Sequence, residues 1–281
     1  MVDWLSEPFG SELMQRALVA GVLAVVATSL VGTWVVLRGM SFMGDALAHG
    51  VLPGAAIAFL LGLDLVLGAF VSALVMVGGI NVVNRRARLA EDTGIGLLFV
   101  GMLALGVVII SRARTFTTDL QGFLFGDILG VTWADVRVEA VAAAVVLAAM
   151  VACYRPFLAL AFNADKAATL GLSPRLSHLL MLGLVAVAIV SSFRSVGALL
   201  VFGLLVAPPA TASLLVRRVP AIMATSVLLG VTAVVLGLAC SYHYDLAAGA
   251  AMAGLSVLGF FAALAVTELA ALVGGRRLKP A

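Results

Sequence analysis

Residues 17–37, ALVAGVLAVVATSLVGTWVVL, decide the fold of this chain because they form 21 consecutive positions without a charged side chain. About 20 consecutive apolar residues are enough for an α-helix to cross the hydrocarbon core of a bilayer. The residues before this stretch are acidic at Asp3, Glu7 and Glu12, and no basic region leads into a cleavage site. We therefore expect a retained membrane-spanning helix rather than a signal peptide.

The composition extends this expectation to the whole chain. Of 281 residues, 63% are hydrophobic and only 11% are charged, and the mean hydropathy is +1.21. One soluble core cannot bury that much apolar surface. Long apolar runs favour helices over an outer-membrane barrel, because lipid requires every backbone polar group to be bonded internally. We predict an all-α, polytopic membrane helical bundle that forms one domain over residues 1–281.

Nine stretches are long or apolar enough to cross the membrane. They lie near residues 17–37, 40–63, 65–83, 93–111, 138–153, 176–193, 196–216, 221–240 and 246–266. The fifth is short and the seventh contains Pro208 and Pro209, so either can be a broken or re-entrant segment. The prediction is therefore eight or nine transmembrane helices.

The basic residues predict how these spans are oriented. With nine spans and a cytoplasmic C-terminus, twelve of the seventeen basic residues lie inside, which is the bias expected of cytoplasmic loops. The twelve are Arg38, Arg85, Arg86, Arg88, Arg155, Lys166, Arg175, Arg217, Arg218, Arg276, Arg277 and Lys279. The net charge of +3 thus reflects membrane orientation, and no basic stripe predicts a nucleic-acid partner.

Asp45 and His49 are the ionisable residues within the second apolar stretch, near residues 40–63. A charged Asp at the centre of a membrane helix costs about 2.5–3.5 kcal/mol on insertion scales, so it calls for a compensating partner. The four-residue spacing places both side chains on one face of a helix. One oxygen and one nitrogen donor leave zinc, manganese and iron open, whereas the absence of a nearby thiolate disfavours copper(I). We predict that the pair meets a passing metal ion near the middle of the membrane; the alternative is a hydrogen-bonded pair that locks helix packing.

The segment around this pair carries a family resemblance. Residues 38–54, RGMSFMGDALAHGVLPG, resemble the second-helix signature of the permeases of zinc and manganese ATP-binding cassette importers, with Ala48 and Gly50 in place of the usual serine and alanine. Segments 119–130, 196–215 and 241–249 resemble later parts of the same family in the same order. The resemblance implies a fold similar to the metal-chelate-type importer permeases, a prokaryotic cytoplasmic membrane location, and transport by alternating access.

The resemblance also implies partners and further functional residues. Residues 163–175 resemble the cytoplasmic coupling segment, with Asp165, Ala167 and Gly171 as residues that contact a separate ATPase. A second permease copy, an extracytoplasmic metal-binding protein and membrane lipid complete the expected assembly. Tyr242, His243 and Asp245 lie at a predicted external turn, where they form part of an outer gate for the metal or a solvated loop.

The chain itself is not expected to be an enzyme. It has no G-x-x-x-x-G-K-[ST] sequence, since neither Lys166 nor Lys279 follows a glycine, so ATP bound by a P-loop belongs to a partner. An intramembrane metalloenzyme lacks the H-E-x-x-H sequence here. A permease for iron chelates or cobalamin and an ATP-independent secondary metal carrier are the alternatives that the sequence leaves open.

Overall fold

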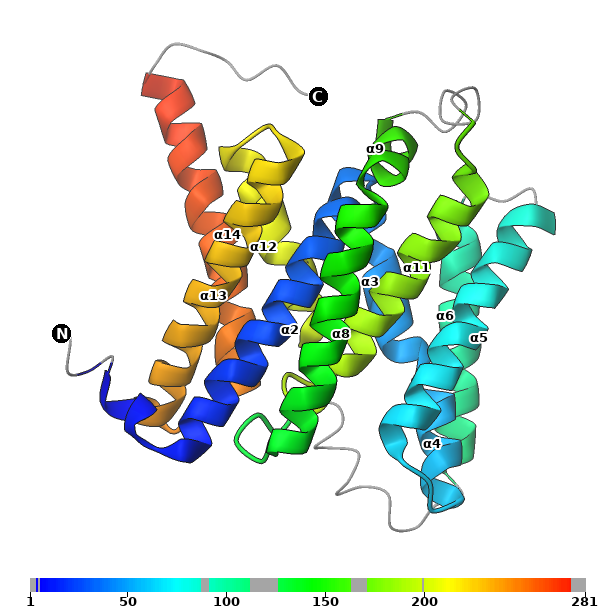
Figure 1. Cartoon of the computed structure of the whole chain (residues 1–281), viewed down its shortest axis with the longest axis horizontal. Helices are drawn as coiled ribbons and strands as arrows, with labels where there is room; N and C mark the ends of the chain where they lie inside the picture. Colours follow the sequence, from blue (N-terminus) through cyan, green and yellow to red (C-terminus); the bar gives the residue numbers. More distant parts are fainter. Residues whose placement is uncertain are drawn as a thin grey trace.

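The computed structural model describes residues 4, 6–86, 91–111, 126–162, 171–198 and 200–273. Within these ranges the regular secondary structure is entirely helical, as predicted (Figure 1). The elements are η1 (Glu7–Gly10), α2 (Glu12–Leu37), α3 (Ser41–Gly50), α4 (Leu52–Leu60), α5 (Leu65–Arg86), α6 (Glu91–Ile110), α8 (Trp133–Ala152), α9 (Tyr154–Phe162), α11 (Pro174–Ser191), α12 (Val201–Leu215), α13 (Val219–Tyr244) and α14 (Ala248–Val273).

The helices correspond to the nine predicted stretches. Among the described residues, seven helical segments are long and apolar enough to cross a membrane, and the bent pair α8 and α9 makes up to eight. Helices α3 and α4 together form one of these spans, Phe42–Leu60. The remaining stretch, the seventh in order, corresponds to the shorter apolar helix α12.

The last described helix ends on the face opposite to the one where the first long helix begins. Helix α2 starts at the lower edge of Figure 1 and α14 finishes at the upper edge, as an odd number of crossings requires. Arg38, Arg86, Arg175, Arg217 and Arg218 all lie at helix ends on the upper edge. The positive-inside rule therefore places the upper edge in the cytoplasm and the lower edge outside.

Helix boundaries follow from local capping. The Ser11 hydroxyl accepts the Met14 N–H at the start of α2. At its end, Gly39 has φ +66° and Met40 N–H bonds the Val35 carbonyl, which is the geometry of a Schellman cap. Thr132 and Asp135 form a capping box at the start of α8. These caps fix the turns that join neighbouring spans.

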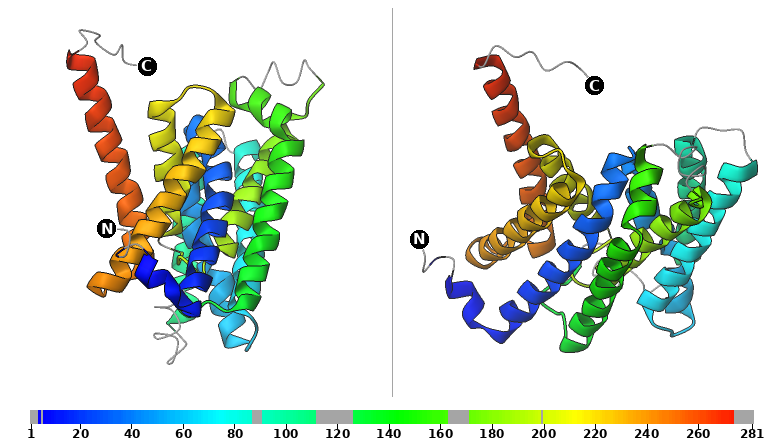
Figure 2. Two further views of the ribbon diagram at one scale, coloured as in Figure 1. Left: turned by 60° about the vertical axis from the view of Figure 1, so that its left-hand side comes forward. Right: turned by 45° about the horizontal axis from the view of Figure 1, so that its top comes forward.

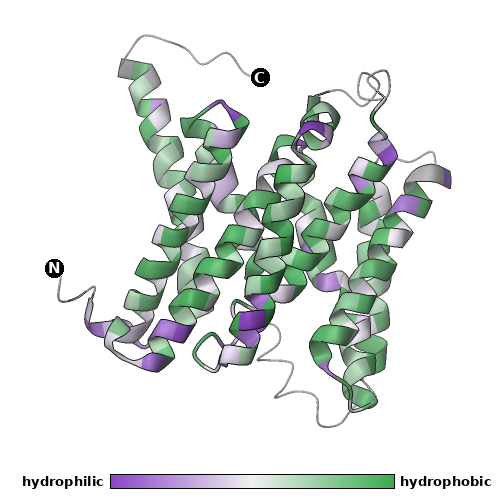
Figure 3. Ribbon diagram, viewed as in Figure 1, coloured by the Kyte–Doolittle hydropathy of each residue, from purple (hydrophilic) through white to green (hydrophobic). Residues whose placement is uncertain are grey.

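Helix α2 lies at the centre of the bundle, between α8, α12 and α13 (Figure 2). Its Trp34 is fully buried, and the indole N–H donates to the sulfur of Met150 at 3.1 Å. A second group forms where α4 packs on α5 and α6, and α3 packs on α6. Apolar residues make up most of the helices, and hydrophilic ones gather toward the two edges (Figure 3). Many of the large apolar side chains on these helices are exposed. This distribution fits a chain whose helices face lipid.

The fifth and seventh predicted stretches are the irregular ones. Helices α8 and α9 meet at a bend of 68°. The seventh stretch, near residues 196–216, is preceded by turns at Ser192–Val196 and becomes helical only at Val201. Pro208 and Pro209 lie inside α12 without breaking it, so the turns, rather than the prolines, shorten this helix.

Candidate metal site

Helix α3 carries Asp45 and His49 on one face, as their spacing predicts. Asp45 Oδ1 lies 3.5 Å from His49 Nε2, and the two side chains are 34% and 20% exposed. Hydrogen bonds between nitrogen and oxygen usually measure 2.7–3.2 Å. A separation of 3.5 Å is too long for a good hydrogen bond, and this favours a role other than locking the two side chains together.

The same separation suits two ligands of one ion. With metal–ligand distances of about 2.0–2.2 Å, two donors at a tetrahedral angle lie roughly 3.4 Å apart. The observed donor pair needs little movement to reach that arrangement. Among the described residues, no group of three or more His, Cys, Asp and Glu side chains is placed to hold one metal ion. Two ligands from this chain therefore leave the rest of a coordination shell to water or to another subunit.

Two aromatic rings border the pair, and the sequence did not single them out. Phe99 on α6 meets the His49 ring edge to face, with centroids 5.5 Å apart. Phe42, one turn before Asp45, packs against the same Phe99 at 5.8 Å. These contacts hold the imidazole against α6. No sequence signal could identify Phe99, because it is one of 14 phenylalanines in a chain of apolar helices.

The position of the pair along its span can be counted in residues. Within the span Phe42–Leu60, His49 is seven residues from the upper end and eleven from the lower end. At a rise of 1.5 Å per residue these are about 10 Å and about 16 Å. The pair thus lies in the half of the span nearer the cytoplasmic edge.

The helix is interrupted just after His49, and Pro53 contributes to this interruption. Helix α3 ends at Gly50 and α4 begins at Leu52, with Pro53 in its first turn. A proline at this position cannot donate a backbone bond to the carbonyl of His49. The Gly50 carbonyl next to it accepts the Ser72 hydroxyl of α5 at 2.8 Å. Contact with α5 therefore stabilises the helix break beside Pro53.

The predicted outer gate residues lie at the end of α13 and are not joined to the Asp45 and His49 pair. Asp245 ends the helix in the left-handed conformation, with φ 52°. His243 Nε2 lies 2.9 Å from the carbonyl oxygen of Trp4, and the His243 ring stacks on that indole at 4.7 Å. Tyr242 meets His243 edge to face at 5.2 Å. A gate role for these three residues stays a prediction.

The predicted coupling segment is only partly described. Asp165 and Ala167 lie outside the described residues. Gly171 has φ +74°, a conformation that favours glycine, and leads into α11, where Ser173 and Pro174 form the N-terminal cap. The short helix α9 precedes the segment at the upper, cytoplasmic edge (Figure 1). The coupling role also stays a prediction.

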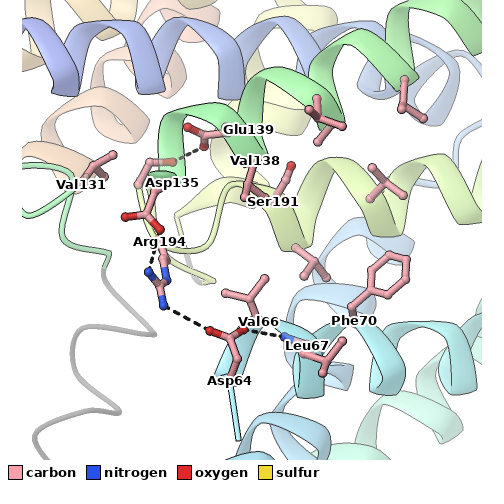
Figure 4. A pocket seen from close by; sticks show the side chains of 16 residues that line it. Asp64, Val66, Leu67, Phe70, Val131, Asp135, Val138, Glu139, Ser191 and Arg194 are labelled. Carbon is pink, nitrogen blue, oxygen red and sulfur yellow. Dashed lines mark hydrogen bonds and ion pairs between the residues drawn. The ribbon is translucent and has the colours of Figure 1, made fainter. Parts of the chain in front are cut away.

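A polar cluster near the outer edge was missed by the sequence analysis. Arg194 donates to Asp135 at 2.6 Å and lies 3.4 Å from Asp64, whereas the sequence analysis assigned it no partner. One turn deeper in α8, Glu139 is only 3% exposed and accepts the Ser195 hydroxyl at 2.5 Å. Figure 4 shows Arg194 between the two aspartates, at one end of a cavity of about 630 Å³.

Ser195→Ala should destabilise the protein because it removes the hydroxyl that bonds the buried Glu139 carboxyl group. Leaving a buried polar group without its partner costs about 1–3 kcal/mol. The measurement is the apparent melting temperature of the detergent-solubilised chain. Ser191→Ala is the matched control, since its hydroxyl donates to the Ala188 carbonyl of the same helix. Equal melting temperatures for the two variants would contradict this account.

The membrane-crossing helices define a polytopic membrane protein. The chain belongs to the ABC 3 transport family, whose profile matches residues 10–267. It is therefore a transport subunit rather than an enzyme, and a multi-pass protein of the prokaryotic plasma membrane. A "Probable iron transport system membrane protein" of Haemophilus influenzae is 35% identical, over 96% of this chain and 99% of that protein.

Other relatives and solved structures agree on the fold. The "Manganese transport system membrane protein MntC" of Listeria monocytogenes is 35% identical, over 89% of each chain. The structure described as PsaBC from Streptococcus pneumoniae in complex with Fab is 32% identical, with a TM-score of 0.83 over 94% of this chain and 95% of that one. A putative metal-chelate type ABC transporter in an inward-facing conformation is 14% identical with a TM-score of 0.69, over 91% and 85% of the two chains, and shares the fold alone.

Proposed function

We propose that this chain is the membrane-spanning permease subunit of an ATP-binding cassette importer for a divalent transition metal ion. The observation that carries the proposal is the Asp45 and His49 pair, whose donors lie 3.5 Å apart on a partly exposed face of α3. A transport site must bind an ion well enough to admit it and weakly enough to release it. Two ligands from one chain suit that requirement better than a closed structural site, which normally has four.

Manganese is the first candidate among the metals. Relatives over most of the chain carry manganese in their names, and a carboxylate with an imidazole leaves both manganese and zinc open. Iron is the second candidate, because the Haemophilus influenzae relative that matches along nearly its whole length is named for iron transport. A larger iron chelate or cobalamin would gain little from two small ligands on one helix face.

The proposed assembly follows from what this chain does not carry. The 281 residues contain no P-loop sequence, so ATP hydrolysis takes place on a separate cytoplasmic subunit. Helix α9, which lies at the cytoplasmic edge, and the predicted coupling segment, residues 163–175, transmit that subunit's motion to α8 and α11. A second permease copy completes the path, and an external metal-binding protein delivers the ion. Alternating access then moves the metal past Asp45 and His49.

The test is uptake of radioactive manganese, zinc and iron(II) by the complex of this chain and its ATP-binding subunit in proteoliposomes. We expect uptake to require hydrolysable ATP on the side of the ATP-binding subunit. Of the three ions, manganese should saturate uptake at the lowest metal concentration. Uptake driven by an ion gradient without ATP would instead make the chain a secondary carrier. Uptake of an iron chelate or cobalamin, with no transport of free ions, would contradict the proposal of a metal-ion importer.

A further inference from the structure

A groove on the lipid-facing side of the bundle is not explained by metal transport. The cavity of about 630 Å³ lies between α5, α8 and α11, and its lining is polar at one end and apolar along the rest. Asp64, Asp135 and Arg194 form the polar end, near the outer edge, whereas Phe70, Val145 and Val187 line the apolar end (Figure 4). The Asp45 and His49 pair lies on α3, which contributes no residue to this lining.

The length of the groove matches one leaflet of a bilayer. On α8 the lining runs from Asp135 to Val145, ten residues along the helix, which is about 15 Å at a rise of 1.5 Å per residue. The hydrocarbon core of a bilayer is about 30 Å thick. A groove that starts at the outer helix ends and extends about 15 Å inward therefore covers the depth of the outer leaflet.

The sides of the groove open toward lipid rather than toward the protein interior. Leu67 on one side is 57% exposed, and Val138 and Val141 on the other are 58% and 64% exposed. All three belong to helices that cross the membrane. The floor is formed by α11, where Val190 is only 3% exposed. An acyl chain lying between α5 and α8 would thus cover apolar surface that the chain does not cover itself.

The charge at the polar end selects a headgroup. Three carboxyl groups, those of Asp64, Asp135 and Glu139, line the groove together with the guanidinium of Arg194. Asp64 accepts the Leu67 N–H and Arg194 donates to Asp135 in addition to their mutual contact. Both side chains are nevertheless 53% exposed, so each retains room for a further partner. An ammonium group complements the excess of acid, and a phosphate complements the open side of the guanidinium.

We propose that this groove is a binding site for one outer-leaflet phospholipid with a primary ammonium headgroup, such as phosphatidylethanolamine. The ammonium lies at Asp64, the phosphate at Arg194, and one acyl chain follows α8 toward Val145. An anionic headgroup such as that of phosphatidylglycerol has no ammonium group to pair with Asp64. Its negative charge is repelled by the same carboxyl groups. A trimethylated headgroup, as in phosphatidylcholine, keeps the charge but has no N–H to donate to the carboxylate.

Native mass spectrometry of the full-length chain, with defined lipids added one at a time, tests the site. We expect one phosphatidylethanolamine to bind about tenfold more tightly than phosphatidylglycerol or phosphatidylcholine, since about 1.4 kcal/mol corresponds to a factor of ten and a hydrogen bond to a charged group contributes at least that much. Asp64→Asn should remove most of this headgroup preference. Val141→Trp should fill the groove and weaken binding of phosphatidylethanolamine about tenfold.

Val151→Trp is the matched control, because Val151 lies on the same helix, is 74% exposed and is not part of the lining. It should bind phosphatidylethanolamine as the wild type does. Equal binding of the three lipids to the wild type, or equal effects of the two tryptophan variants, would overturn the proposal. So would efficient crosslinking between copies through Val141→Cys in membranes, because a second protein chain would then occupy the groove.

Discussion

Metal uptake should fall at least about tenfold when Asp45 is replaced by asparagine or His49 by alanine in the assembled complex. Asparagine keeps the size of the side chain but removes its charge, and alanine removes the only imidazole on α3. Losing a group that merely orients a metal ligand typically costs 10–100-fold, so losing a ligand itself should cost no less. Initial rates of ATP-dependent manganese uptake in proteoliposomes measure the effect.

Assembly with the ATP-binding subunit distinguishes loss of the metal site from unfolding of the variant. Both variants should co-purify with the ATP-binding subunit and melt near the wild-type temperature, because the two side chains are partly exposed and 3.5 Å apart. Asp127→Asn is the matched control, since Asp127 accepts the Gly130 N–H in the turn before α8. If the Asp45 and His49 variants transported metal at the control's rate, the proposed metal site would be wrong.

The second large effect is expected at Gly32, where the backbone of α12 lies against α2. A Cβ at Gly32 would lie 1.8 Å from the carbonyl oxygen of Leu205, far inside any allowed contact. Pro209, four residues after Leu205, has no N–H to bond that carbonyl. The carbonyl instead faces α2, and only glycine leaves space for it.

Gly32→Ala should therefore force α2 and α12 apart and destabilise the protein by about 3 kcal/mol or more, at or beyond the upper end of overpacking costs. The colliding atoms belong to a backbone and cannot rotate away as a side chain would. The measurements are the yield of monodisperse protein and its apparent melting temperature. Gly101→Ala is the control, because a Cβ on that α6 residue meets nothing within 4 Å. Similar melting curves for both variants would contradict the geometry.

The sequence predicted the spans well because each depends on local composition. An uninterrupted apolar run such as residues 17–37 determines a helix without reference to any neighbour. The same holds for Asp45 and His49, whose relation depends only on a four-residue spacing within one helix. The orientation also follows from local counts, since arginines at helix ends such as Arg38 and Arg175 mark one edge of the bundle.

Contacts between distant segments could not be predicted in this way. Arg194 pairs with Asp135 and Asp64, which precede it by 59 and 130 residues, and no local pattern links them. Trp4 reaches His243 across 239 residues. Phe99 meets His49 only because α3 and α6 pack together. A single sequence shows which side chains are unusual within a span. Which of these side chains contact one another depends on how the helices pack.

The prolines of α12 show the same limit. Pro208 and Pro209 predicted a broken segment, because each removes a backbone bond, yet both lie inside a continuous helix. In membrane helices, neighbouring helices and Ser or Thr side chains compensate for such losses. Here Gly32 makes room for the free Leu205 carbonyl, and the Thr211 hydroxyl bonds the Ala207 carbonyl at 2.7 Å. The break occurs instead in the turns before Val201.

The most direct test is a structure of the complete transporter with manganese bound, determined with anomalous X-ray scattering at the manganese edge. The account predicts an anomalous peak within coordination distance of both the Asp45 carboxylate and the His49 imidazole, on a path between the membrane subunits. A manganese peak elsewhere in the membrane region, with both side chains turned away from any path, would contradict it.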